Sequence, residues 1–355
     1  MKKIVTTIAA LAMAVSMFAA DVSAKVHIEG SLLNVADGNV KALAIGHKNQ
    51  PWNPDLALSA NGDKAGASVS FVTGNAEDSI ATKNFAVVAQ NYSIWFKPFD
   101  MLKVTVGQYA VDMNQETIDW SNTDTKIETQ GFALDLNVDA FFATAFFAPG
   151  WTNYWFADDA VKNFYFKAGY AADFGRIQAM FRLSAEDGKA NNGDILAGLG
   201  YNNTFGSVNM FANVLFGTNT KIDNSMLVRG ELFASTGIDA FGISAFIAGG
   251  YWAEGARATP QGANGLTGWH VGGSYGLGDK AATLGATLKL TYALDGVTPY
   301  LYFKCGNFMV DTLALQIKPG ATGSVGTMGW ELACDIGVNG DAITVDVPVI
   351  FTVNF

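Results

Sequence analysis

The sequence predicts an all-β protein, a transmembrane antiparallel β-barrel of about 16 to 20 strands. Three observations lead to this fold class. Apolar residues alternate with polar or small ones along most of the chain, the polar positions suit a lumen wall, and no apolar run beyond the amino terminus reaches the length of a helical span. Half of the 355 residues are hydrophobic and only 15% are charged, which is apolar and charge-poor for a soluble protein.

The first residues have the layout of a secretory signal peptide. Lys2 and Lys3 precede an apolar run from Ile4 to about Ala20, and a short polar stretch with small residues follows. The favoured cleavage site follows Ala24, and the second candidate follows Ala20. An N-terminal membrane anchor is the alternative, but the run is short for a spanning helix. We therefore expect a signal peptide at 1–24 and an outer-membrane β-barrel at 25–355.

The body of the chain repeats one strand pattern. The segment "GFALDLNV" places Leu134 and Leu136 on one face and Asp135 and Asn137 on the other, and "RIQAMFRLS" and "TLGATLKLTY" do the same. The second face is rich in Gly, Ser, Thr, Asn and isolated charges, which suit a crowded or water-filled lumen. No helical pattern is present to cover so large a sheet, so closing the sheet with its apolar face toward lipid satisfies every edge.

Aromatic residues such as Trp95 and Phe96 gather at strand ends, as in the girdles at membrane interfaces. The longest stretches without alternation, at 73–89, 111–130, 148–162 and 253–268, are expected to be loops on one side of the membrane. Short turns are expected on the opposite side of the membrane from the long loops. If the first strand starts at Lys25, the count puts the tight connections "KPFD", "ADFG" and "LGDK" on the side of the long loops, which indicates a miscounted strand.

The carboxyl terminus, "VDVPVIFTVNF", is predicted to be the closing strand, paired with "KVHIEGSLL". Phe355, Val353, Phe351 and Val349 form its apolar register, and Pro348 removes a ladder donor, so we expect a bulge there. This terminus resembles that of Gram-negative outer-membrane porins, whose last strand ends in Phe. The hairpin "YSIWFKPFDMLKVTVGQY" also looks like those of spirochaete-type porin-like barrels.

The resemblance implies a location in the outer membrane of a diderm bacterium. It implies outer-membrane lipid and the barrel-assembly machinery as partners, a homotrimer, and an assembly signal made by Phe351, Val353 and Phe355. It also implies a porin, a water-filled channel for passive diffusion of small hydrophilic solutes and ions. The alternatives are a surface-exposed adhesin or structural barrel with a closed lumen, and a ligand-specific transporter. The transporter is disfavoured because the chain is short for roughly 22 strands and a plug.

Charged residues in the polar register are the candidate pore-lining residues. They are Lys97, Lys103, Lys167, Arg176, Arg182, Arg229, Glu231, Lys289, Lys304, Glu331 and Asp335. An acidic loop, "VDMNQETIDWSNTDTKIETQ", sets Asp112, Glu116, Asp119, Asp124 and Glu128 against Lys126 alone. If this loop rims the channel mouth, it predicts a weak preference for cations.

Catalytic and metal-binding patterns are missing from the sequence. His27, His47 and His270 are scattered without metal spacing, and no CxxC, HExxH, GxSxG or Walker motif occurs, so we expect no enzyme activity, cofactor or metal. The excess of 32 acidic over 22 basic residues argues against nucleic acid. Cys305 and Cys334 fall on predicted strands with another strand between them, which disfavours a disulfide but leaves it open.

Overall fold

The computed structural model describes residues 21–36, 39–42, 55–73, 87–111, 127–148, 163–184, 193–253, 281–305 and 314–354. Its regular elements in these ranges are all β-strands. The first ten are β1 (Asp21–Ala36), β2 (Asn39–Ala42), β3 (Asp55–Asn61), β4 (Ala65–Thr73), β5 (Val87–Phe99), β6 (Leu102–Val111), β7 (Ile127–Val138), β8 (Phe141–Ala148), β9 (Asn163–Ala172) and β10 (Gly175–Ser184). The others are β11 (Asp194–Phe205), β12 (Val208–Asn219), β13 (Leu227–Ile238), β14 (Phe241–Trp252), β15 (Ala281–Tyr292), β16 (Val297–Cys305), β17 (Ala314–Val325), β18 (Met328–Ala333), β19 (Asp335–Asn339) and β20 (Ala342–Asn354).

Across these ranges, no helix is both long and apolar enough to cross a membrane.

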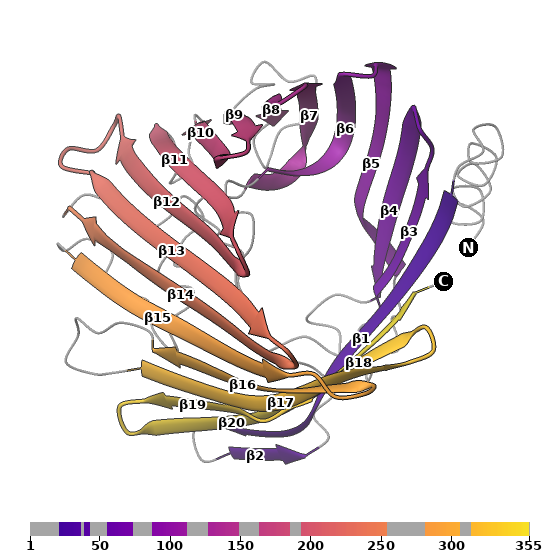
Figure 1. Ribbon diagram of the computed structural model, residues 1–355, viewed down its shortest axis with the longest axis vertical. Helices are drawn as coiled ribbons and strands as arrows, with labels where there is room; N and C mark the ends of the chain where they lie inside the picture. The colour runs from indigo at the N-terminus through magenta and orange to yellow at the C-terminus, as the bar shows by residue number, and fades with distance from the viewer. Residues whose placement is uncertain are drawn as a thin grey trace.

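The strands form one antiparallel sheet that closes into a ring, as Figure 1 shows. Neighbours along the chain pair with each other, and β20 pairs with β1. β2 and β3 both pair with β1, at its two ends, so they are pieces of one barrel strand. β18 and β19 likewise share the place between β17 and β20. The 20 named strands therefore make 20 − 2 = 18 barrel strands, inside the predicted range of 16 to 20.

The two ends of the barrel differ. Eight tight turns, from β3–β4 to β17–β18, lie at the end where β1 begins and β20 finishes, which we call the turn end. The long connections 74–86, 112–126, 149–162 and 254–280 leave from the opposite, loop end. "KPFD" and "ADFG" lie at the turn end and not on the side of the long connections, which agrees with the expected miscount of a strand, and "LGDK" falls outside the described residues. β5 begins at Val87 and β7 at Ile127, so two predicted loops extended too far.

The closing seam pairs the two terminal strands, as predicted. Lys25 lies opposite Asn354 and Ser31 lies opposite Pro348, but beyond this pair Asn34 lies opposite Asp346. β1 therefore carries one extra residue beside Pro348, which gives the expected bulge on the partner strand. On the other side of β20, the ladder is interrupted between β18 and β19 at Cys334. Pro348 lies beside both irregularities, and a second proline without an N–H, Pro319 of β17, lies opposite Cys334 and accepts its N–H.

The two faces of the sheet have opposite composition. Phe166, Ile177 and Leu288 are 41%, 48% and 38% exposed on the outer face. Gln178 and Thr287, which alternate with them, are 4% and 6% exposed on the inner face. Exposed apolar side chains on the convex face of a closed sheet fit lipid and do not fit water. The predicted registers are therefore confirmed for these strands.

Exposed aromatic side chains also mark the turn end. Six aromatic side chains at the tight turns are between 38% and 65% exposed: Phe99, Phe141, Phe174, Phe205, Phe241 and Tyr292. This is the position of an interfacial girdle. Phe96 faces outward with them, but Trp95 shares the inner face with Thr105, so its assignment to the girdle was wrong.

Candidate functional site

The candidate site is the inner wall of the barrel. All eleven predicted pore-lining residues lie in strands and alternate with outward-facing apolar residues. They do not share one environment. Four are buried, and the other seven have part of their surface exposed. Whether the seven line a conducting channel stays a prediction.

The four buried residues are held inside the wall. Arg182 is 3%, Arg229 1%, Glu231 5% and Lys304 0% exposed. Arg229 forms an ion pair with Glu231, and the Asn213 side-chain amide donates a hydrogen bond of 3.2 Å to the same carboxylate. The ion pair lies within β13, and the Asn213 hydrogen bond joins it to β12. Charges removed from water in this way have little contact with passing ions.

Part of the inner wall is apolar, which the alternation did not reveal. Phe146, Tyr165 and Leu215 are fully buried on the inner face of β8, β9 and β12, and Met180 and Leu196 pack with them. Farther toward the turn end, Phe211 and Phe233 stack with centroids 5.1 Å apart. From β8 to β13, much of the wall is therefore packed side chain with little water contact.

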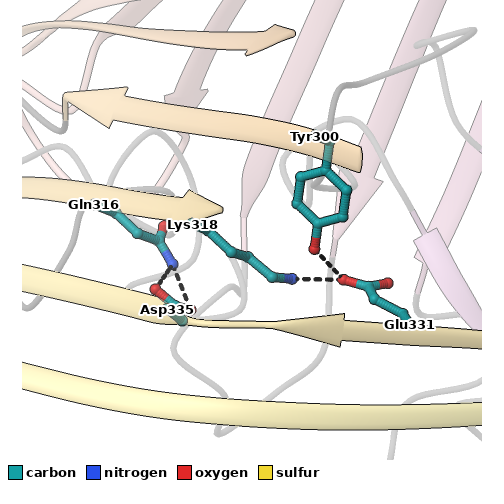
Figure 2. A network of polar contacts seen from close by, with 5 residues as sticks. All are labelled: Tyr300, Gln316, Lys318, Glu331 and Asp335. Atoms are coloured by element: carbon teal, nitrogen blue, oxygen red, sulfur yellow. Dashed lines mark hydrogen bonds and ion pairs between the residues drawn. The ribbon is translucent and has the colours of Figure 1, made fainter. Parts of the chain in front are cut away.

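A half-buried polar network lies on β16 to β19, shown in Figure 2. The Tyr300 hydroxyl donates a 2.5 Å hydrogen bond to Glu331 Oε1, and Lys318 Nζ lies 3.0 Å from the same oxygen. The Gln316 amide donates to both oxygens of Asp335, at 2.7 Å. Glu331 and Asp335 were predicted, whereas their three partners were not. The alternation in "ALQIKPG" carries the signal, because Gln316 and Lys318 fall in its polar register.

Four wall cations lie against aromatic rings. Lys97 and Lys103 have their Nζ atoms 5.8 and 5.2 Å from the Trp95 centroid. Arg176 Cζ lies 3.8 Å from the Phe142 centroid, and Lys289 Nζ lies 5.1 Å from that of Tyr300. Cation–π attraction holds these groups in place. In the described part of the chain, none of the four forms an ion pair with a carboxylate.

The remaining predicted residues are one wall lysine, the assembly signal of the last strand and the acidic loop. Lys167 lies opposite Thr144 and Met180. Phe351 pairs with Ile28 and Trp330, and Val353 pairs with Val26 and Met328. Glu128 belongs to β7, where it pairs with Ala110. Phe355 and the other four acidic-loop residues, Asp112, Glu116, Asp119 and Asp124, lie outside the described ranges.

The two cysteines are free thiols. Cys305 ends β16, Cys334 lies between β18 and β19, and β17 separates them, as the sequence indicated. Among the described residues, no group of three or more His, Cys, Asp or Glu side chains could hold a metal ion.

No protein-family model matches the chain, and no curated protein matches its sequence. Solved structures match its fold. A BenF-like porin from Pseudomonas fluorescens Pf-5 has a TM-score of 0.57 at 12% identity, covering 94% of this chain and 98% of its own. OccK2 (OpdF) of Pseudomonas aeruginosa, solved with glucuronate, has a TM-score of 0.56 at 10% identity, with coverage of 94% and 98%. A loop-deletion mutant of OmpT, an outer membrane protein of Vibrio cholerae, has a TM-score of 0.51 at 11% identity, with coverage of 95% and 99%.

These matches span almost the whole of each chain. At such low identities they establish a shared architecture, so the likeness to porins predicted from the terminal strand is confirmed for the fold. The spirochaete-type resemblance of the β5–β6 hairpin stays a prediction.

Proposed function

We propose that this protein is an outer-membrane porin, which forms a water-filled channel for passive diffusion of small hydrophilic solutes and ions. The observation that carries the proposal is the opposite composition of the two faces of a closed sheet. The outer face exposes apolar residues such as Phe181 and Leu232, whereas the inner face carries Lys97, Arg176 and Asp335. A wall of this kind suits aqueous passage through lipid.

The proposal includes the cell biology that the sequence and its resemblance to porins imply. The barrel resides in the outer membrane of a diderm bacterium, is exported by its signal peptide, and is inserted by the barrel-assembly machinery through its last strand. A homotrimer is the assembly that the porin resemblance implies. Two of the structural neighbours support the location and the solute class, since one is an outer membrane protein of Vibrio cholerae and another was solved with glucuronate, a small hydrophilic solute.

Liposome swelling tests the channel. Purified barrel reconstituted into liposomes should let small sugars enter at a rate that falls steeply as the sugar grows, because the lumen selects solutes by size. Liposomes that contain heat-denatured protein are the control. Failure to admit even the smallest sugar would establish a closed lumen and favour the surface-exposed adhesin or structural barrel.

A further inference from the structure

Three aromatic rings of the inner wall each lie across a glycine of the adjacent strand. Ring and glycine are direct cross-strand partners in every case: Trp95 with Gly66, Phe142 with Gly169, and Tyr300 with Gly320. A β-carbon at any of these glycines would collide with the ring. The missing side chain lets the ring approach the backbone of the adjacent strand, in contact with the wall of the barrel.

The four wall cations described above lie against these same three rings. Trp95 lies near both Lys97 and Lys103, Phe142 near Arg176, and Tyr300 near Lys289. An aromatic face attracts a cation without neutralising its charge. Each ring therefore fixes a charged group at the wall and leaves it able to bind an anion.

Nearby carboxylates offset this charge only in part. Asp135 lies opposite Lys103 in the ladder and accepts a 2.8 Å hydrogen bond from Thr144. Near the third ring, Lys289 and Lys318 accompany two carboxylates: Glu331 is bound by Tyr300 and Lys318, and Asp335 by Gln316. Near Trp95, two lysines accompany one aspartate. Among the described residues, the balance is therefore positive near Trp95.

All four cations lie close to the turn end. β5 ends at Phe99, β6 begins at Leu102, β10 begins at Gly175 and β15 ends at Tyr292. Each cation is among the last four residues of its strand at that end, which is roughly 13 Å or less along the strand. β5, β10 and β15 are well separated around the ring in Figure 1. Lys97, Lys103, Arg176 and Lys289 thus form a cationic collar around the turn-end mouth.

Outside the cationic collar, aspartates occupy six of the tight turns. They are Asp63, Asp100, Asp139, Asp173, Asp239 and Asp295, and all are exposed. Lys64 pairs with Asp100. Because these carboxylates lie in bulk water beyond the strand ends, salt screens them over about 8 Å at physiological ionic strength. An anion that has passed this rim meets the cationic collar inside the lumen, where low-dielectric walls focus the field of these charges.

We propose that the cationic collar is a contact site for small oxyanions, carboxylates or phosphates, at the turn-end mouth of the lumen. The proposal rests on the proposed channel function and adds a solute class and a place. Ammonium and guanidinium groups form charge-assisted hydrogen bonds with such anions. The adjoining ring offers apolar contact to the carbon skeleton of a carboxylate.

Block of single channels by inorganic tripolyphosphate tests the proposal. The probe is added first to one chamber of a planar bilayer and then to the other. In the wild type, block should be stronger from one chamber, because the cationic collar lies at one end. Lys97→Gln/Lys103→Gln should weaken that stronger block roughly tenfold, and Arg176→Gln should weaken it in the same direction. Phe142→Leu, which removes the ring under Arg176 without changing charge, should weaken it by a smaller factor.

Lys221→Gln is the matched control, since it removes an exposed cation from the loop end. It should leave the block unchanged. Open-channel conductance before the probe is added shows that each variant has folded. Equal block from the two chambers in the wild type, or unchanged block in Lys97→Gln/Lys103→Gln, overturns the anion site while leaving the channel intact. A reconstituted barrel without conductance overturns both proposals.

Discussion

Pro348 faces Ser31 across the seam between the last strand and the first, and the register of the two strands shifts directly beyond this pair. On the other side of Pro348, β18 ends at Ala333 and β19 begins at Asp335. Both neighbours of β20 are therefore irregular at the level of the proline. Regular closure depends on the six residues from Val349 to Asn354, which pair with β1 without interruption.

Deleting "FTVNF" is expected to prevent assembly. The deletion removes the partners of Lys25, Val26, His27 and Ile28, which are most of the regular part of the seam. We expect exported but unfolded protein in the periplasm, detected by loss of the heat-modifiable band on gels, and a weaker effect in the same direction for Phe355→Ala. Normal heat-modifiable barrel in the outer membrane after the deletion would contradict this expectation.

Arginine substitutions should distinguish the lipid-facing face from the inner face by their effect on stability. Phe181→Arg, Leu134→Arg and Leu288→Arg should each destabilise the barrel by about 2 to 4 kcal/mol near the bilayer midplane, whereas Asn137→Arg should have little effect because that inner residue is exposed. Urea titration of folding into lipid vesicles measures the difference. Gln178 and Thr287 share the inner register but are buried, so arginine there should also destabilise. Equal effects at Phe181 and Asn137 would mean that the outer face is not in lipid.

The buried ion pair should stabilise the barrel without controlling ion flow. Glu231→Gln leaves the Arg229 charge without its carboxylate in a dry wall, which should reduce the free energy of unfolding by about 3 kcal/mol. Lys64→Ala is the control, because the Lys64–Asp100 pair is largely exposed and should contribute less than about 1 kcal/mol. Urea titration gives both values. A large change in reversal potential for Glu231→Gln would be inconsistent with a buried, structural role.

Ion selectivity should reflect two opposing sets of charge. We expect a weak cation preference in planar bilayers under a KCl gradient, set by Asp112, Glu116, Asp119, Asp124 and Glu128. Neutralising these five acids should reduce the preference, Lys97→Gln/Lys103→Gln should increase it, and high salt should weaken both effects. Anion preference in the wild type would refute this expectation. It would assign control to Lys167 and Arg176, since Arg182 and Arg229 are buried.

The mature chain should retain Asp21 to Ala24. These four residues pair with Asn61 to Leu58 of β3. Cleavage after Ala24, which the sequence favours, would remove four ladder residues, whereas cleavage after Ala20 keeps them. Mass spectrometry of the purified outer-membrane protein gives the answer directly. A mature mass that starts at Lys25 would show that β1 is shorter in the membrane.

Alternation in sequence was enough to predict the barrel, because the side-chain period of a strand places lipid-facing and inner residues in fixed registers. It could not predict the state of each inner residue. Lys304 and Lys97 both fall in the polar register of their strands. Lys304 is nevertheless fully buried, whereas the side chain of Lys97 is partly exposed beside Trp95. That difference depends on side chains brought in by neighbouring strands. No local pattern in the sequence contains this information.

The number of strands was predictable only as a range, because it too depends on how distant segments pair. The break at Cys334 and the insertion at 43–54 divide two barrel strands, and both are visible only once the pairing with β17 or β1 is known. Pro348 was the exception. A proline in an alternating strand indicates a local defect, although the sequence did not show that the defect would appear in the adjacent strands.

The pairing of β1 with β20 has a consequence for the order of folding. Every other neighbouring pair of barrel strands is contiguous along the chain or nearly so, whereas this ladder joins Lys25 to Asn354. The entropy lost on closing a flexible segment grows with its length, by about 0.6 kcal/mol for each doubling, so a direct encounter of the two ends of an unfolded chain is disfavoured. Once successive hairpins have formed a curved sheet, little free chain remains between the ends. We therefore expect the seam to form last, and slow steps in folding kinetics to respond to changes in β1 and β20 more than to changes in the central hairpins.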